Sequence, residues 1–475
     1  MKKMSVAIPA LALIGVMLTL AHVDAGQARQ GGGTPPPAQR YTAEARNMTL
    51  VSHTTLNGRG DGGEAMELVE WPDGRRILVF VHQADENCLS FVDVTDPAKP
   101  EVVAHIPSPS PGATQCNGLG RSGNVLAVAN WTTNADQKGH KGFWLLDVSS
   151  PERVVKARSL QDLALSYYDA TAGPYARGAH WLWFVDGEFV HLAMTDGNKE
   201  PSGNGHDLMY IIVDVRDQKN PREVGRWWAP GTMKGDPCLP GCAPTYASRA
   251  HNIQVYPDRP DRAYVGYFGA GWYILDISGL ADIKAGRART FTPKVISRLY
   301  TGPGLPVNSH TIQPIPGTDL AWAGDEAINV PNGPEKCVRS PKMLWLVNIK
   351  DETNPVPWTY APLAHNAAEL CQRPGRYGPY NLHSNEPDGK ILKNTMVASY
   401  FGGGVRIFRL APVVGLGNVP PRIVEIGHYI PEPPDGAATA ESGNVLVGPD
   451  GTIYLGDRRV GGLYILRYTG QEPLD

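Results

Sequence analysis

The chain has 475 residues and a formal net charge of −3, with 44 basic and 47 acidic residues spread along it. This balance argues against a nucleic-acid partner or an anionic membrane surface. Gly and Pro contribute 53 and 42 residues, a content typical of many short strands joined by turns.

The N-terminus has the pattern of a secretory signal. Two lysines at 2–3 precede an apolar run over 6–20, and small residues lead to a cleavage site after Ala25. The run is too short for a membrane anchor, so we expect a signal peptide over 1–25 and no integral membrane segment after cleavage. Residues 26–45 begin with a stretch rich in Gly, Pro and Gln, which predicts a flexible leader. The mature chain is therefore expected in the periplasm or outside the cell.

From residue 46 onward, one strand pattern returns along the chain. Its copies include LSFVDVTDPAKP, FWLLDVSSPERV and GWYILDIS. The copies start near residues 89, 143, 208, 271, 343, 404 and 462, with a mean spacing of about 60. Strands that are apolar on both faces must lie between neighbouring sheets, which radial packing achieves. We therefore predict an all-β fold, a seven-bladed β-propeller of four-stranded blades, as a single domain over 46–475.

The seventh unit lacks an outer strand, because the chain ends soon after YILRY. The segment RNMTLVSHTTL at 46–56 has the alternation of a strand. We expect it to pair with the last blade, which closes the ring and covers a free sheet edge.

Six cysteines in an exported chain predict disulfide bonds. The sequence alone does not determine how they pair. We expect the pairs that join loops close together in the repeat, which are Cys88–Cys116, Cys238–Cys242 and Cys337–Cys371.

The repeated strand with VDVTDPAKP resembles the LVIVD-repeat family of propeller proteins, over roughly residues 46–470. The resemblance implies the propeller architecture but no particular activity, since the family has no single known chemistry. Copies in that family often carry a histidine at the head of the first strand and an acidic residue at the end of the second. Blades 1, 6 and 7 of this chain depart from that pattern.

Four consecutive blades begin their predicted innermost strand at or near a histidine, as in SRAHNIQVYP and NSHTIQPIPG. Innermost strands line the channel of a propeller, so their first residues converge on one mouth, where the second strands also end. The side chains expected there are His180, His251, His310 and His383, with Asp325 and Glu326 beside them. The spacing after His383 differs by two residues from the others, which makes Asn381 the alternative and leaves a three-histidine site.

Two interpretations of this histidine ring remain open. In the first, each imidazole bonds a backbone carbonyl or a neighbouring carboxylate and fixes a blade junction. In the second, the imidazoles share a transition metal, with Asp325 and Glu326 as supporting groups or a proton acceptor. All-imidazole ligation favours Fe or Cu, and a carboxylate ligand favours Zn or Mn.

Further candidates lie near two of the histidines. Tyr168 and Arg177 belong to a Tyr-rich connection before His180, and Arg249 precedes His251 by two residues. Such groups bind anionic or phenolic substrates or act as acid and base. The alternative is a loop that packs over the blades.

The chain contains no G-x-S-x-G, phosphate-binding loop or dinucleotide fingerprint, so serine hydrolase, NTPase and Rossmann hypotheses have no support. The favoured hypothesis is an exported, metal-dependent oxidoreductase or oxygenase that acts on a small organic substrate as a monomer. The alternatives are a metal-dependent lyase or hydrolase of an acidic saccharide, and a non-catalytic propeller that binds a protein partner.

Overall fold

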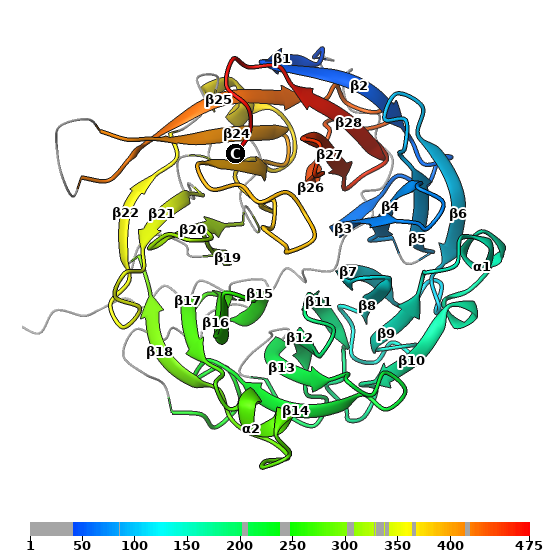
Figure 1. The fold of residues 1–475 in the computed structure, drawn as a ribbon, viewed down its shortest axis with the longest axis vertical. Helices are drawn as coiled ribbons and strands as arrows, with labels where there is room; N and C mark the ends of the chain where they lie inside the picture. Colours follow the sequence, from blue (N-terminus) through cyan, green and yellow to red (C-terminus); the bar gives the residue numbers. More distant parts are fainter. Residues whose placement is uncertain are drawn as a thin grey trace, which may run out of the picture. The chain divides into compact units, whose positions relative to one another are not determined.

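The computed structural model describes residues 41–84, 86–201, 208–237, 248–301, 308–326, 328, 337, 342–362, 367–413 and 419–475. Their strands form seven four-stranded antiparallel sheets arranged as blades around a ring (Figure 1). The predicted all-β, seven-bladed propeller is therefore confirmed. Within the described part of the chain, no helix combines the length and apolar character that a membrane crossing needs. The predicted signal peptide lies outside the described residues.

In the first five blades the chain runs from the innermost strand outward. Blade 1 contains β3 (Gly62–Glu70), β4 (Arg76–His82), β5 (Asn87–Asp93) and β6 (Glu101–Pro107). Blade 2 contains β7 (Gln115–Ser122), β8 (Val125–Trp131), β9 (Gly142–Asp147) and β10 (Ala164–Asp169). Blade 3 contains β11 (Ala179–Trp183), β12 (Phe189–Thr195), β13 (Leu208–Asp214) and β14 (Arg222–Trp227).

The next two blades follow the same plan. Blade 4 contains β15 (Arg249–Tyr256), β16 (Arg259–Phe268), β17 (Gly271–Asp276) and β18 (Lys294–Leu299). Blade 5 contains β19 (Ser309–Pro314), β20 (Leu320–Asp325), β21 (Leu344–Asn348) and β22 (Val356–Tyr360). Short helices lie in connections, namely α1 (Pro151–Lys156), η1 (Leu160–Asp162), α2 (Leu280–Lys284) and α4 (Ala367–Gln372).

The last two blades each take a strand from the N-terminal segment. Blade 6 contains β23 (Thr395–Ser399), β24 (Val405–Ala411), β25 (Arg422–Ile430) and β1 (Glu44–Arg46). Blade 7 contains β26 (Ser442–Val447), β27 (Thr452–Asp457), β28 (Leu463–Tyr468) and β2 (Met48–Thr54). On the channel side of blade 6, residues 381–383 bond to β23 in place of a full strand, with a bridge between Leu382 and Ala398.

The ring closes through the N-terminal segment, as predicted. Strand β2 pairs antiparallel with β28, with Met48 opposite Tyr468 and Thr54 opposite Leu463. Strand β1 then continues onto β25 of blade 6, a pairing that the sequence analysis did not anticipate. Asn47 lies between the two strands with a φ of 52°, a conformation that Asn tolerates better than most residues. One segment thus covers the outer edges of two adjacent blades.

Each blade is apolar on both faces, and strand β13 shows how. All seven of its residues are buried. Tyr210 and Ile212 pack in the cluster shared with blade 4, whereas Met209 and Ile211 pack in the cluster shared with blade 2. Burial of one such side chain contributes about 1.5–3 kcal/mol. A blade is therefore stable only between two neighbours.

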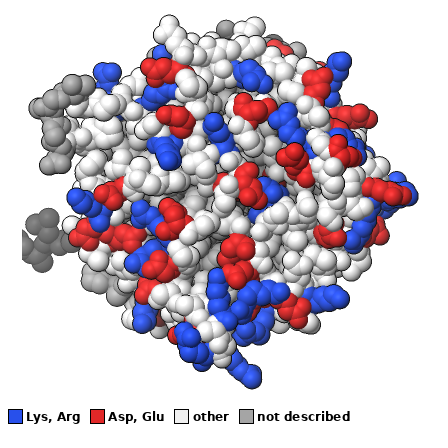
Figure 2. Space-filling view, viewed as in Figure 1, with Lys and Arg blue, Asp and Glu red and all other residues white. Residues whose placement is uncertain are grey.

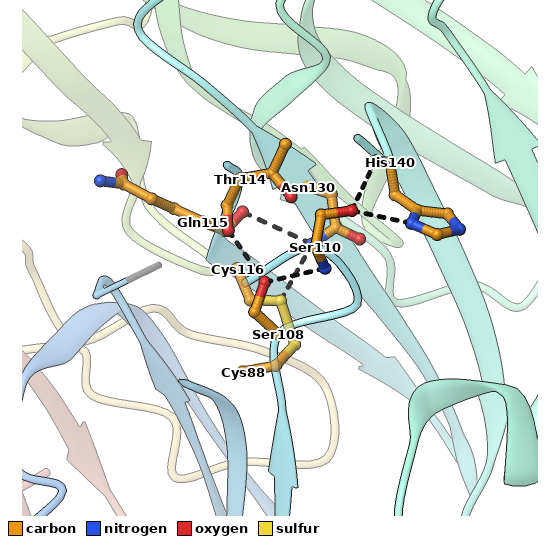
Figure 3. Close-up of a disulfide and its surroundings, with 8 residues drawn as sticks. All are labelled: Cys88, Ser108, Ser110, Thr114, Gln115, Cys116, Asn130 and His140. Atoms are coloured by element: carbon orange, nitrogen blue, oxygen red, sulfur yellow. Dashed lines mark hydrogen bonds between the residues drawn. A yellow bond between two sulfur atoms is a disulfide. The ribbon is translucent and has the colours of Figure 1, made fainter. Parts of the chain in front are cut away.

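Two of the predicted disulfides are present. Cys88 in β5 of blade 1 bonds Cys116 in β7 of blade 2 (Figure 3), and Cys337 bonds Cys371. The Asn130 amide donates to the Cys116 sulfur at 2.9 Å. The third predicted pair, Cys238–Cys242, lies outside the described residues. The first bond joins two blades covalently next to the channel.

We expect ring closure to depend on β1 and β2. Deletion of residues 26–57 leaves the edges of β25 and β28 unpaired, so the protein should aggregate, as measured by size-exclusion chromatography with light scattering. Deletion of 26–40 alone is the control and should leave the elution volume and melting temperature unchanged. A 26–57 deletion variant that elutes and melts like the parent contradicts the closure.

We expect the Cys88–Cys116 bond to stabilise the junction of blades 1 and 2. Peptide mapping without reduction should recover these cysteines as one cross-linked peptide. Replacement of both by Ala should lower the free energy of unfolding by about 3–4 kcal/mol, because the bond closes a loop with a sequence separation of 28. Denaturant titration measures this loss. A free thiol at Cys116 in the purified protein contradicts the assignment.

Candidate metal centre

Three histidines from three adjacent blades meet at one mouth of the channel, which we call the head mouth because the innermost strands begin there. His180 belongs to β11, His251 to β15 and His310 to β19. The Nε2 atoms of His180 and His251 lie 3.0 Å apart, and the ring centroids of His251 and His310 lie 4.2 Å apart. All three side chains are buried. The structure thus brings together three of the four histidines that the sequence analysis singled out.

A local irregularity of the innermost strands lies at each of these positions. The register between the innermost and second strand shifts at the head of blades 1, 2, 3, 4, 5 and 7. Such a β-bulge bends a strand and re-aims a side chain. Glu64, His180, His251 and His310 each lie within one of these shifts, in blades 1, 3, 4 and 5.

Two carboxylates complete the cluster. Glu64 lies with one oxygen 3.5 Å from His180 Nε2 and the other 3.7 Å from His251 Nε2. Glu326, which follows β20, lies 3.9 Å from His310 Nε2. Two sets of possible metal ligands result, with their ligand atoms within 4.8 Å of one another, namely Glu64, His180 and His251, and His251, His310 and Glu326. His251 belongs to both, so the five side chains form one cluster.

The second ring nitrogen of each histidine contacts a neighbouring polar side chain. Nδ1 of His251 donates to the side-chain oxygen of Asn252 at 2.8 Å, and Nδ1 of His310 lies 2.7 Å from the Thr311 hydroxyl. Nδ1 of His180 accepts from the Asn117 amide nitrogen at 3.3 Å, so its Nε2 carries the hydrogen and donates to His251 Nε2 at 3.0 Å. In His251 the hydrogen is on Nδ1, so Nε2 has a free lone pair, as a metal ligand requires, and the same holds for His310 when its Nδ1 donates to Thr311. For His180 to bind a metal through Nε2, its hydrogen has to move to Nδ1.

Two buried atoms of the cluster lack hydrogen-bond partners among the described residues. They are Nε2 of His310 and one carboxylate oxygen, Oε2, of Glu64. Leaving a polar atom buried and unpaired costs about 1–3 kcal/mol. A cation among the three imidazoles and Glu64 supplies a partner for both atoms, so the residues present fit a metal ion.

The protonation states suit a cation. Burial lowers the pKa of His180 and of His310 well below the ordinary value, which keeps both imidazoles neutral at neutral pH. Burial alone opposes ionisation of Glu64, but attraction to His180 and His251 in their protonated forms and to the Arg458 guanidinium outweighs it and lowers the pKa of Glu64 well below its usual range. When the imidazoles are neutral, Arg458 is the cation that favours the carboxylate. The cluster therefore presents neutral imidazoles and an ionised carboxylate.

Arginines and aromatic rings surround the cluster. Arg458 lies 3.3 Å from Glu64 and also bonds the Tyr380 hydroxyl. Arg376 lies 3.1 Å from Glu326 and 3.5 Å from Glu441, with its guanidinium 3.9 Å from the centroid of Phe401. These side chains come from the loop after β27 and from the segment before blade 6, so two further blades contribute to the surroundings.

His383 does not join the cluster. Its Nε2 lies 2.7 Å from the Lys390 carbonyl and its Nδ1 accepts from the Val447 amide at 3.2 Å. Both ring nitrogens are thus occupied by backbone groups, and the side chain joins blade 6 to blade 7. Asn381, the alternative named in the sequence analysis, lies closer to the cluster and donates to the Glu64 carbonyl at 3.2 Å.

The other predicted site residues divide into two sets. Asp325 is buried at the end of β20, and burial raises its pKa to about 6 against the opposing effect of Lys342. Arg249 lies over the ring of Phe268, 4.8 Å from its centroid, and the same ring stacks on His251 at 4.6 Å. Asp325 and Arg249 therefore lie near the ligand cluster, on the strands that carry it.

Tyr168 and Arg177 lie elsewhere. Tyr168 is in β10, the outermost strand of blade 2 (Figure 1). Its ring stacks on Phe143 with centroids 5.4 Å apart. Arg177 donates its side chain to the Thr133 carbonyl in a connection of blade 2. The structure does not bring these two side chains to the histidines.

Sequence reasoning did not select Glu64 and Arg458 as site residues. Glu64 is near the start of the innermost strand of blade 1, where a carboxylate does not match the histidine that starts this strand in blades 3, 4 and 5. The signal that identifies it is position, since it occupies the place in blade 1 that His180 occupies in blade 3. Arg458 follows the last residue of a second strand, the place that Glu326 occupies in blade 5.

Comparisons with known proteins give likeness in fold alone. No family model matches the chain, so the resemblance to the LVIVD-repeat family stays a prediction, and no curated protein matches it. The β-propeller domain of Cps50 (Swd1) from Myceliophteria thermophila is 12% identical over 88% of this chain and 99% of that one, with a TM-score of 0.48. A putative 6-phosphogluconolactonase from Bacteroides fragilis is 10% identical over 82% and 90%, with a TM-score of 0.49. The designed protein Ika8 is 10% identical over 82% and 80%, with a TM-score of 0.42.

Proposed function

We propose that this chain is a metal-dependent enzyme with its ion at the head mouth of the propeller channel. His180, His251, His310 and Glu64 would hold the ion, with Glu326 as a fifth ligand or as a proton acceptor beside it. The observation that carries the proposal is the pair of buried, unpartnered ligand atoms, His310 Nε2 and Glu64 Oε2. A cation bound between them would supply a partner for both atoms.

The donor set bears on the kind of metal. Three imidazoles with one or two carboxylates differ from the all-imidazole set that would favour Cu. Mixed imidazole and carboxylate ligands with an open position are those of non-haem Fe(II) oxygenases, and they also suit Mn and Zn. Fe(II) suits both the all-imidazole set and a mixed set, so it stays our first choice ahead of Zn and Mn, which the carboxylates favour. An Fe(II) centre would support an oxidoreductase. When bound, such an ion activates a small molecule at its open position.

The residues around the ion supply substrate binding and proton transfer. Arg376 pairs with Glu326 at 3.1 Å and holds this carboxyl group beside the cluster, where it could accept a proton from a bound substrate. Arg458 and Arg376 present guanidinium groups suited to a carboxylate of a small organic acid. The same arginines favour a lyase or hydrolase of an acidic saccharide as the second candidate, and a preparation that holds Zn and no Fe would support it.

His310→Ala tests the metal centre, with His383→Ala as the matched control. Both remove a buried imidazole from the channel side of a blade, but only His310 belongs to the cluster. The parent, purified from its native compartment without chelators, should hold about one transition-metal ion per chain. His310→Ala should lower the affinity by more than about 100-fold, because even groups that only support a ligand cost 10–100-fold. His383→Ala should keep the ion.

Elemental analysis and titration with Fe(II) or Co²⁺ measure both results, and circular dichroism checks the fold. A parent chain that binds no transition metal contradicts the proposal. Equal loss of metal from the two variants also contradicts it, because the ion would then depend on blade packing and not on these ligands.

A further inference from the structure

A glycine occupies the head of the innermost strand of blade 7. Gly443 lies within the register shift between Ser442 and Asn444, the place that Glu64 takes in blade 1 and His180 in blade 3. Gly443 does not have a positive φ, so its backbone conformation does not require glycine. The need for a residue without a side chain comes from the space around it.

The side chain of Arg458 fills that space. A Cβ atom on Gly443 would lie 2.1 Å from Cγ of Arg458 and 2.8 Å from its Cδ, whereas carbon atoms in contact lie about 3.5–4.0 Å apart. Arg458 therefore lies across the position that a side chain of residue 443 would take, with only 10% of its side chain exposed. Its Nη1 donates to Glu64 Oε1 at 3.3 Å and also to the Tyr380 hydroxyl.

Tyr380 holds the guanidinium group in place. The guanidinium carbon of Arg458 lies 4.9 Å from the centroid of the Tyr380 ring. Tyr380 is fully buried and stacks on Phe401 with centroids 4.4 Å apart, and its ring lies 5.0 Å from that of His310. Packing and a hydrogen bond together leave the Arg458 side chain few other positions, so its donor stays at Glu64.

The backbone of Glu64 is held as well. Nδ2 of Asn381 donates to the Glu64 carbonyl at 3.2 Å and to the Gly443 carbonyl at 2.9 Å. The Ser399 hydroxyl donates to the same Gly443 carbonyl at 3.3 Å. One amide of the segment before β23 thus joins the heads of blades 1 and 7. Blades 6 and 7 contribute no side chain to the proposed ligand set, but their residues hold the ligand of blade 1.

The two carboxylate oxygens of Glu64 have different surroundings. Oε1 accepts the charge-assisted hydrogen bond from Arg458 and lies 3.5 Å from His180 Nε2. Oε2 lies 3.7 Å from His251 Nε2, is buried and has no hydrogen-bond partner among the described residues. Arg458 therefore engages one oxygen and leaves the other for a cation.

We infer that Arg458 is a positioning residue of the metal centre, which holds Oε1 so that Glu64 binds the ion through Oε2 alone, and that Gly443 provides the room for it. This inference rests on the proposed function for the ion itself, and it adds which oxygen of Glu64 is the ligand and what orients it. Without Arg458, the carboxylate turns and either leaves the ion or binds it through both oxygens. Both changes alter the coordination number, which Co²⁺ reports through the intensity of its visible absorption.

The sign of one measurement separates this role from a simple effect of charge. A guanidinium group repels a cation nearby, so removal of Arg458 should tighten metal binding if only its charge matters. Removal of a group that orients a ligand weakens metal binding instead, typically by about 10–100-fold.

Titration of the metal-free protein with Co²⁺ in competition with a chelator gives the affinity, and the visible absorption is recorded at saturation. Arg458→Met keeps an unbranched side chain and removes the donors, so it should weaken Co²⁺ binding about 10–100-fold and change the absorption intensity. Arg459→Met is the matched control, because this neighbouring guanidinium is 62% exposed and pairs with Glu441 at 3.2 Å. It should keep the parental absorption and an affinity within about threefold, since solvent and salt screen exposed charges.

Gly443→Ala tests the same contact without replacing Arg458. The added methyl group should displace the Arg458 side chain, and so weaken Co²⁺ binding with the same change in absorption. In the Arg458→Met background it should add little further loss, because the contact that it disturbs is already absent. Circular dichroism checks the fold of each variant, and Gly443→Ala decides the question if Arg458→Met does not fold.

Four results would overturn the inference and leave the proposed function intact. They are parental affinity and absorption in both Arg458→Met and Gly443→Ala, tighter binding in Arg458→Met, an equal loss in Arg459→Met, and weaker binding with unchanged absorption intensity. The last would mean that Glu64 binds the ion as it does in the parent. A parent chain that binds no Co²⁺ fails the proposed function itself, before any variant is compared.

Discussion

The burial of both faces of every blade is the constraint on which the rest of this structure depends. A strand such as β13 is buried along its whole length and divides its side chains between two neighbouring blades. Such a sheet has no stable arrangement alone, so the blades must form a closed ring. The N-terminal strands β1 and β2 complete the edges of the last two blades, and the Cys88–Cys116 bond joins the first two. The channel and its polar lining follow from this closure.

A closed ring also brings equivalent positions of different blades close together. The innermost strands point in the same direction, so their first residues surround one mouth, and the β-bulges at those positions aim Glu64, His180, His251 and His310 at one another. Burying four such groups without a cation is costly, and two of their atoms have no partner in the described protein. The proposed metal-dependent activity rests on this combination of buried imidazoles, carboxyl groups and flanking arginines. Elsewhere on the face shown in Figure 2, acidic and basic side chains lie interspersed.

The repeat made the architecture predictable from the sequence. Seven copies of one strand pattern determine the number of blades, the missing outer strand indicates the closing segment, and two cysteine pairs follow from neighbouring loops. The pairing of β1 with blade 6 was not predictable in this way, because it depends on a single turn residue, Asn47, in the left-handed conformation.

The site was predictable only in part, for a related reason. Histidine spacing identified His180, His251 and His310, but the bulges that orient them leave no composition signal. His383 follows the same visible pattern, yet blade 6 has only the short segment 381–383 on its channel side, so this imidazole bonds backbone groups of blades 6 and 7. Glu64 lies at the head of its innermost strand, as the histidines do, but a pattern defined by histidine does not include a glutamate. Tyr168 and Arg177 are near His180 in the sequence, but Tyr168 belongs to β10, the outermost strand of blade 2 and so far from the channel.

The position of the metal ion in the loaded protein is the most direct test of the proposed centre. Crystals of the Fe(II)- or Co²⁺-loaded protein, measured on either side of the metal absorption edge, locate that ion by anomalous difference density. We predict a single strong peak about 2.0–2.3 Å from Nε2 of His180, His251 and His310 and bound also by a Glu64 oxygen. A peak at any other position, or well-ordered crystals in metal-containing buffer with no peak among these four side chains, would contradict the account.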